Sequence, residues 1–179
     1  HYEEGWQEYE WLWKLKKPKY RLPQPLWDGA DIRGKRILLY AEQGFGDAIQ
    51  FVRYASVLRA RGARVIVECR RELTELFCCV PGIDTVITRG EEPPPFDLHV
   101  PMLSLPGIVG TMPQTVPGDV PYVVLPSGLR TQRPAVLAGV PPGPMIGLVW
   151  SGNRVSSIDR ERSLTRHEMF RVLPSGGVT

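Results

Sequence analysis

Short apolar segments alternate with amphipathic segments from Lys35 onward, and this alternation constrains the fold more than any other feature of the chain. Two continuous apolar runs, Ile37–Tyr40 and Val65–Cys69, are typical of buried strands. Between them the apolar residues recur at helical spacing until Gly62 ends the predicted helix; they are Ala48, Phe51, Val52, Ala55 and Leu58. Such alternation predicts an α/β fold, with a mainly parallel sheet that helices cover on both faces.

The same alternation continues toward the C-terminus. We expect a helix over Glu72–Cys79, strands over Asp84–Thr88, Asp97–Val100, Tyr122–Leu125 and Met145–Trp150, and a helix over Leu164–Leu173. The last strand and helix repeat the arrangement that follows Lys35. They therefore predict that residues 35–140 form one α/β domain and that residues 145–179 begin a second, incomplete one.

The N-terminal segment carries an aromatic stripe. Aromatic residues recur at helical spacing and predict a helix over residues 1–16; they are Tyr2, Trp6, Tyr9 and Trp13. A helix of this length is marginal alone in water, so its aromatic face must pack on something or stack on a ligand, and we favour packing. Residues 17–34 are rich in proline and turn residues and predict an extended linker anchored by Trp27.

Composition excludes several classes of protein. The formal net charge is only +3 and no long basic block is present, so the charge distribution does not indicate nucleic-acid binding. No apolar run approaches the roughly 20 residues of a membrane helix, and we expect no membrane span. The cysteines, Cys69, Cys78 and Cys79, have neither a disulfide framework nor zinc-site spacing. We therefore expect a reduced, cytoplasmic protein without a metal.

The segment Tyr40–Gln50, YAEQGFGDAIQ, places Gly44, Gly46 and Asp47 where the first strand gives way to a helix. It matches neither GxGxxG, because Ile49 takes the third glycine's place, nor the P-loop, because its Lys-Ser/Thr pair is absent. Two glycines allow a tight turn and close approach of a ligand. The carboxyl end of a parallel strand is also where open α/β sheets bind ligands.

The order of several motifs along nearly the whole chain resembles a group of bacterial tetratricopeptide-repeat proteins that end in a heptosyltransferase-like glycosyltransferase module. The motifs are W..YEW.W, P.W.G, AEQGFGDAIQFVRYA, FDLHVPMLSLP and IGLVWSGN...DRERS. This resemblance implies the GT-B architecture, in which two Rossmann-like domains face each other across a cleft. Residues 1–16 would then end the repeat region, residues 35–140 would be the acceptor-side domain, and residues 145–179 would begin the donor-side domain.

The resemblance implies a catalytic role for Asp47. In the resembled enzymes the aspartate of the matching Gly-Asp pair is the proposed general base, which takes the proton of the acceptor hydroxyl as its oxygen attacks the anomeric carbon. A helix N-terminus keeps a carboxylate ionised and weakens it as a base, so this role requires exclusion of water or orientation of the hydroxyl. The alternative is that Asp47 and Gly46 only cap the helix.

Four further residues are candidates for acceptor binding. Glu42 and Gln43 precede the glycines, where they could bind sugar hydroxyls or simply face water. His99 and Ser104 flank the end of the predicted strand Asp97–Val100. His99 could contact the acceptor or assist proton transfer, and its alternative is a structural role.

The donor-side candidates follow the predicted strand Met145–Trp150; they are Ser151, Gly152, Asn153, Arg160 and Arg162. In the resembled enzymes this turn belongs to the donor side. Guanidinium groups pair well with phosphate oxygens, so the two arginines could bind the donor's diphosphate. Alternatively, Asp159 pairs with one of them in a solvated loop. No metal is expected, because the sequence has no Asp-x-Asp pair to hold one.

These observations predict the N-terminal half of a metal-independent glycosyltransferase, inactive alone, that moves a sugar from a nucleotide-sugar donor to a hydroxyl of a glycan or protein. No cofactor besides that donor substrate is expected. One alternative is a non-catalytic scaffold whose Rossmann-like module and helical repeats bind proteins, and another is a nucleotide-binding regulator. Because exposed strand edges recruit partners, a dimer formed through residues 145–179 is a further expectation.

Overall fold

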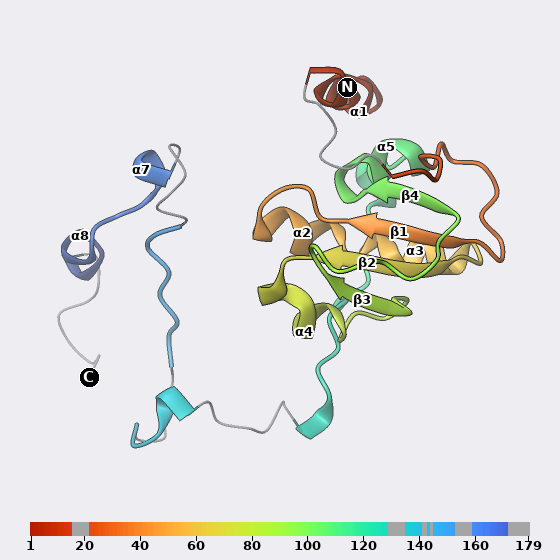
Figure 1. The fold of residues 1–179 in the computed structure, drawn as a ribbon. Helices are drawn as coiled ribbons and strands as arrows, with labels where there is room; N and C mark the ends of the chain where they lie inside the picture. The colour runs from red at the N-terminus through yellow and green to blue at the C-terminus, as the bar shows by residue number, and fades with distance from the viewer. Residues whose placement is uncertain (16–21, 129–134, 141–142, 144, 153–158, 172–179) are drawn as a thin grey trace. The chain divides into compact units, whose positions relative to one another are not determined.

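The computed structural model describes residues 1–15, 22–128, 135–140, 143, 145–152 and 159–171. The chain divides into two compact units, His1–Gln132 and Arg133–Thr179, and each is considered by itself. The first unit holds the sheet, the linker and the N-terminal helix (Figure 1).

A four-stranded, fully parallel sheet forms the centre of the first unit, in the order β3-β2-β1-β4. Its strands are β1 (Arg36–Tyr40), β2 (Arg64–Cys69), β3 (Thr85–Thr88) and β4 (Leu98–Pro101). At the start of the pair β1–β4, the backbone N–H of Arg36 donates to the Asp97 carboxylate at 2.7 Å. The predicted Rossmann-like α/β fold, a parallel sheet flanked by helices, is confirmed, although the described helices pack on one face of the sheet rather than on both.

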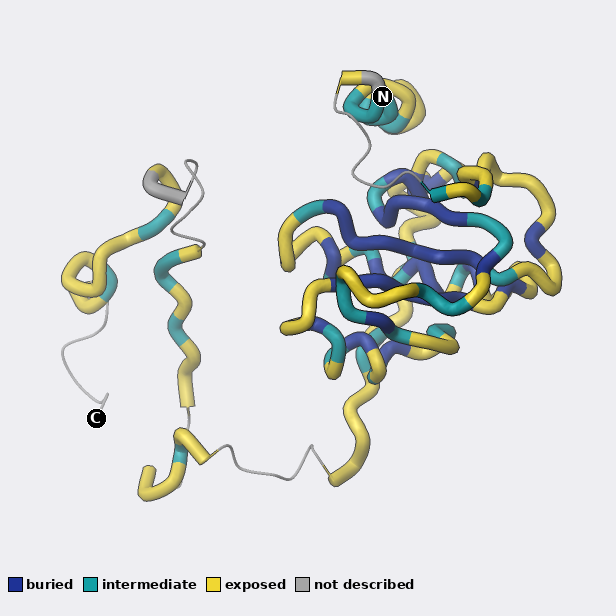
Figure 2. The backbone as a smooth tube through the Cα atoms, in the orientation of Figure 1, coloured by how far each residue is buried: buried dark blue, intermediate teal, exposed yellow. Residues whose placement is uncertain are grey.

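Helices pack on one face of this sheet. They are α2 (Phe45–Phe51), α3 (Tyr54–Ala60), the 3-10 turn η1 (Arg71–Leu73) and α4 (Thr74–Phe77). Their apolar side chains share one buried core with alternate residues of β1 and β2, among them Val52, Ala55, Leu58, Ile37, Leu39, Val65 and Val67. The strand β1 is buried along most of its length (Figure 2). The single helix predicted here is divided into α2 and α3, although Val52 and Arg53 between them keep helical backbone angles.

The opposite face of the sheet has a smaller core. Leu38, Ile66 and Ile87 are buried there with Phe96, which comes from the segment before β4, and Leu22 is partly buried beside them. The same face carries polar groups: the rings of Tyr40 and His99 lie 5.8 Å apart, and an Arg89 nitrogen lies 3.7 Å from a Glu68 carboxylate oxygen.

The N-terminal helix α1 (Tyr2–Leu15) is fastened to the segments that follow β4. The indole N–H of Trp6 donates to the carbonyl of Thr111 at 2.9 Å, and that of Trp13 donates to the Ser104 hydroxyl at 3.3 Å. These segments are the 3-10 turn η2 (Met102–Ser104), α5 (Leu105–Val109) and the 3-10 turn η3 (Pro113–Thr115). The predicted helix is confirmed, and Trp6, Tyr9 and Trp13 of its aromatic face pack as expected, whereas Tyr2 is exposed.

The linker also contributes to the sheet. The N–H of Trp27 donates to the carbonyl of His99 at 2.9 Å, and the N–H of His99 donates to the carbonyl of Pro25 at 3.2 Å. Leu26 thereby forms a parallel bridge on the outer edge of β4. The side chain of Trp27 is buried and its indole N–H donates to Ala30, which confirms its predicted anchoring role.

Two predicted strands are wrong. Tyr122–Leu125 is irregular and makes one backbone bond to the helical layer, from the N–H of Val124 to the carbonyl of Cys79. Met145–Trp150 is irregular too, and its apolar side chains Ile146 and Val149 are exposed. A strand requires a neighbouring strand for its N–H and C=O groups, and no described strand pairs with this segment, whose Trp150 carbonyl accepts the N–H of Leu164 at 2.8 Å instead.

The described helical segments of the second unit are the 3-10 turn η4 (Ala135–Leu137), α7 (Asp159–Arg162) and α8 (Arg166–Arg171). The helix predicted over Leu164–Leu173 is present as α8, and its last two residues lie outside the described part. Thr165 and Glu168 cap its start, because the N–H of Thr165 donates to the Glu168 carboxylate at 2.7 Å. Throughout the described residues, every helix is too short or too polar to cross a membrane.

Candidate functional site

The strand order creates a ligand-binding edge between β1 and β4. The chain leaves β1 toward β2 on one side, whereas β4 lies on the other side, which makes the β1–β4 border the topological switch point. In open α/β sheets, ligands bind outside the carboxyl ends of the strands at such a point. Two segments distant in sequence meet here, Ala41–Asp47 after β1 and Met102–Ser104 after β4.

Glu42 joins these two segments. One carboxylate oxygen accepts the N–H of Met102 at 3.1 Å and the other accepts the N–H of Leu103 at 3.0 Å, and the side chain is buried. Burial raises the pKa of Glu42, the two N–H groups oppose that rise, and the nearby charge of Asp47 adds to it. The structure thus assigns Glu42 to holding the edge together, and its contact with an acceptor stays a prediction.

Asp47 lies at the same edge and is exposed. Its Oδ2 accepts the N–H of Gly44, the residue before α2, at 3.1 Å. The helix-capping contact that we named as the alternative to catalysis is therefore present, and the carboxylate of Asp47 makes it. Because the side chain is both exposed and oriented by this bond, capping leaves the carboxylate accessible to a ligand.

The glycines of this turn have a different role from the predicted one. Gly44 has φ −74° and ψ 178°, which any residue adopts, and Gly46 does not have a positive φ. The tight turn thus needs no glycine, and that part of the prediction is wrong. A Cβ at Gly46 would meet no atom within 4 Å, so open space lies beside this backbone, as close approach of a ligand requires.

Helix α1 brings an additional residue to the edge. The hydroxyl of Tyr9 is buried beside the side chain of Gln43. Burial raises the pKa of Tyr9, interaction with Gln43 opposes this rise, and the negative charges of Glu42 and Asp47 add to it. The helical spacing of Tyr9 with Trp6 and Trp13 predicted that Tyr9 lies on the packing face of the helix. Nothing in the sequence indicated that this face packs near the residues that follow β1.

His99 and Ser104 are buried and have structural surroundings. His99 packs against Tyr40, and burial lowers the pKa of its imidazole, which favours the neutral form. The Ser104 hydroxyl accepts the indole N–H of Trp13. The structural alternative named for His99 fits this position better than proton transfer does, and the acceptor contacts of both residues stay predictions.

The donor-side candidates are only partly described. The N–H of Gly152 donates to the Ser163 hydroxyl at 3.0 Å, Ser151 is partly exposed, and Arg162 ends α7 with an exposed side chain. Asn153 and the side chain of Arg160 lie outside the described part. The phosphate role of the arginines stays a prediction.

Two hollows lie near α1. The larger has a volume of about 700 Å³ and lies between α1, the linker and α5, and the smaller, of about 400 Å³, is formed by α1 itself. Neither is lined by Asp47 or Gln43. Among the described residues, no group of three or more His, Cys, Asp and Glu side chains is arranged to hold a metal ion.

Comparison with known proteins gives one partial similarity. The chain is 39% identical over 51 residues to Protein FlbA of Caulobacter vibrioides, a match that covers 27% of this chain and 9% of FlbA. The match therefore spans far less than two thirds of that protein. No family model matches the sequence. No solved structure matches it either.

Proposed function

We propose that this chain is the acceptor-side part of a GT-B glycosyltransferase and that Asp47 acts on the acceptor hydroxyl. The observation that carries the proposal is the position of Asp47, exposed and oriented by Gly44 at the carboxyl edge of β1, beside the switch point of a parallel sheet. The motif order that resembles heptosyltransferase-like modules supports the same reaction class.

The proposed chemistry uses the second oxygen of Asp47. Oδ2 is occupied by the Gly44 N–H, while Oδ1 accepts no hydrogen bond from the described residues. An acceptor alcohol donates to Oδ1, its oxygen forms a bond to the anomeric carbon of the donor, and the bond from that carbon to the diphosphate breaks. The nucleoside diphosphate leaves with the bonding electrons, and the alcohol proton passes to Asp47.

The donor side of the proposal involves the second unit. Ser151, Gly152, Asn153, Arg160 and Arg162 would bind the nucleotide sugar, with guanidinium groups on its diphosphate. We also propose that α1 ends a tetratricopeptide-like repeat region that binds proteins. A cytoplasmic location is proposed because Cys69, Cys78 and Cys79 are all free thiols.

The test is transfer by a protein that contains this chain together with its complete donor side. A panel of nucleotide sugars is screened for release of nucleoside diphosphate in the presence of alcohol acceptors. Asp47→Asn retains an oxygen for the Gly44 N–H and loses the base, so we expect transfer to fall by roughly 10²–10⁴-fold. Asp119→Asn, at an exposed carboxylate elsewhere, is the matched control, and full transfer by Asp47→Asn would eliminate the base role.

A second candidate is a non-catalytic scaffold. It is favoured by the observation that Glu42 and Asp47 both bond backbone N–H groups, which is sufficient to explain each of them structurally. A wild-type protein that transfers no sugar from any donor of the panel would favour this candidate. Calorimetry with free nucleotides would separate it from a nucleotide-binding regulator.

A further inference from the structure

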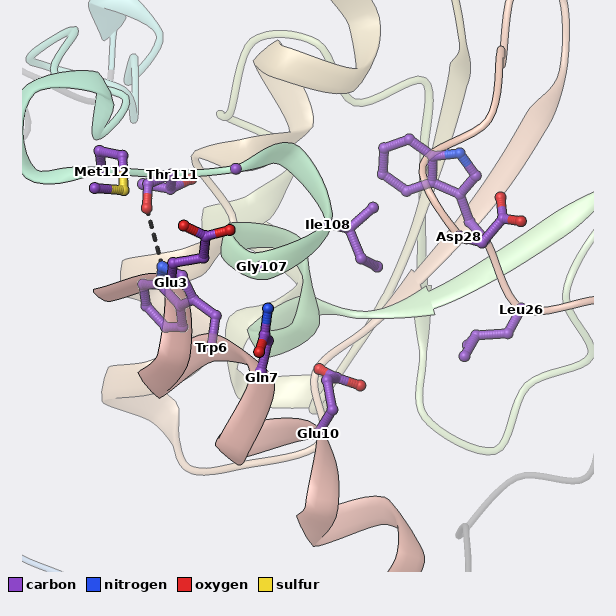
Figure 3. A pocket seen from close by; sticks show the side chains of 12 residues that line it. Glu3, Trp6, Gln7, Glu10, Leu26, Asp28, Gly107, Ile108, Thr111 and Met112 are labelled. Atoms are coloured by element: carbon purple, nitrogen blue, oxygen red, sulfur yellow. Dashed lines mark hydrogen bonds between the residues drawn. The ribbon is translucent and has the colours of Figure 1, made fainter. Parts of the chain in front are cut away.

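A groove with apolar walls lies between α1, the linker and the end of α5, and we call it the α1 groove (Figure 3). Trp6 and Ile108 form parts of its walls, and Leu26 and Met112 also line it, with 52% and 42% of their surfaces exposed. Its volume is about 700 Å³. Large apolar side chains exposed together beside a hollow are typical of binding surfaces, and methionine adapts well to different partners.

The charged side chains among the described lining residues of the α1 groove are all negative. Glu3 and Glu10 line it from α1, and Asp28 lines it from the linker, whereas none of its described lining residues is Lys or Arg (Figure 3). The chain as a whole has the opposite sign, with 22 Lys and Arg against 19 Asp and Glu. The groove therefore concentrates negative charge on an apolar surface of a weakly basic protein, and such a surface attracts a partner that is both basic and apolar.

The geometry of the walls favours an extended chain segment as the occupant. Glu3 and Glu10 are separated by two turns of α1, roughly 10 Å along its axis. Side chains on one face of an extended peptide recur every roughly 7 Å, so two Lys or Arg residues of one segment reach both carboxylates. The intervening apolar side chains point to the other side of such a segment, away from α1, where Leu26 and Ile108 line the groove.

From this charge and shape we infer that the α1 groove binds a short, extended segment of a partner protein in which apolar residues alternate with Lys or Arg. The inference does not depend on sugar transfer, because neither Asp47 nor Gln43 lines the groove.

The first test compares two short fluorescein-labelled peptides for binding to the full chain by fluorescence anisotropy. One peptide alternates leucine with lysine and the other alternates leucine with glutamate. We expect the leucine–lysine peptide to bind at least about tenfold more tightly, because exposed ion pairs contribute modestly and several act together. Equal affinities, or no binding of the leucine–lysine peptide, would overturn the inference.

The second test reverses charge at matched positions. The double variant Glu3→Lys with Glu10→Lys changes the groove, whereas Glu8→Lys with Glu75→Lys changes the net charge equally at exposed sites that do not line it. We expect about a tenfold loss of affinity for the leucine–lysine peptide in the groove variant and less than about a twofold loss in the control. Equal losses would attribute binding to net charge and refute the groove as the site.

A third measurement uses the wild-type chain and so does not depend on the folding of a variant. The indole N–H groups of Trp6 and Trp27 belong to residues that line the groove, whereas Trp13 does not line it. On addition of the leucine–lysine peptide, we expect the NMR resonances of the first two indoles to shift and that of Trp13 to stay. Movement of Trp13 alone, or of no indole, would contradict binding in the groove.

Discussion

The indole N–H of Trp6 in α1 donates to the backbone carbonyl of Thr111, 105 residues further along the chain, at 2.9 Å. This bond fixes the N-terminal helix to the segment that follows α5. A Cβ added at Gly107 of α5 would lie 3.1 Å from the Cβ of Trp6, so the two helices are already in close contact. The helix predicted as a remnant of a repeat region is therefore an integral part of the first unit.

Replacement of Trp6 by phenylalanine tests this attachment. Trp6→Phe keeps an aromatic ring but leaves the carbonyl of Thr111, a buried residue, without its donor. We expect the free energy of unfolding, measured with urea, to fall by about 1–3 kcal/mol. Tyr2→Phe removes a polar group from an exposed aromatic residue of the same helix and should change stability little. Similar losses in both variants would show that the Trp6 bond has no particular role.

The buried carboxyl of Glu42 predicts a pH dependence of stability. Burial raises the pKa of Glu42 above its ordinary value of 4.5, so the folded chain holds this proton more tightly than the unfolded chain does. The contribution of Glu42 is therefore most favourable below the unfolded pKa and declines as pH rises through the folded pKa. We expect the unfolding free energy of the wild type, relative to that of Glu42→Gln, to decrease from pH 4.5 toward neutral pH. A constant difference across this range would contradict the raised pKa.

Asp47 can be tested for capping separately from catalysis. Asp47→Ala removes the acceptor of the Gly44 N–H and should lower the unfolding free energy by about 0.5–1 kcal/mol. Asp47→Asn keeps an acceptor oxygen and should remain close to the wild type in the same urea titration. If Asp47→Asn lost as much stability as Asp47→Ala, its use as a selective probe of the proposed base would fail.

Two glycines are expected to respond to alanine with opposite signs. Gly82 has φ +92°, and a Cβ there would lie 3.1 Å from the Cα of Ser56, so both backbone strain and a clash oppose Gly82→Ala. We expect a loss of at least about 1–2 kcal/mol, seen as a lower thermal unfolding midpoint. Gly46 lies within α2 with open space around it, and Gly46→Ala should raise stability by about 0.5–1 kcal/mol. Equal responses would refute this assignment.

The sequence predicted those parts of the fold that depend on local pattern. Ile37–Tyr40 and Val65–Cys69 are strands because continuous apolar runs are buried on both faces of a parallel sheet. Tyr122–Leu125 has similar residues but no neighbouring strand, and no local pattern reveals whether a neighbour exists. The pairing of Leu26 with His99 could not be predicted from the sequence either, because it joins a proline-rich segment to a strand distant in sequence.

The candidate site was predictable only in its location. The position of Asp47 after β1 placed it at the ligand-binding edge, and the structure shows it exposed there. Glu42 holds the edge together by accepting the N–H groups of Met102 and Leu103. The hydroxyl of Tyr9 is buried there because of where α1 docks. These are tertiary contacts between distant segments, which composition and periodicity do not encode.

The central position of β1 has a consequence for synthesis of the chain. β1 pairs with β2 soon after both have left the ribosome, but its other neighbour, β4, emerges later, and the contact between Arg36 and Asp97 spans 61 residues. Until then, one side of a strongly apolar strand stays open in the nascent chain, and α1, although made earlier, has nothing to dock on, because Ser104 and Thr111 follow β4. Completion of this unit must therefore wait for its last strand, and a ribosome stalled before β4 would present β1 to chaperones or to aggregation.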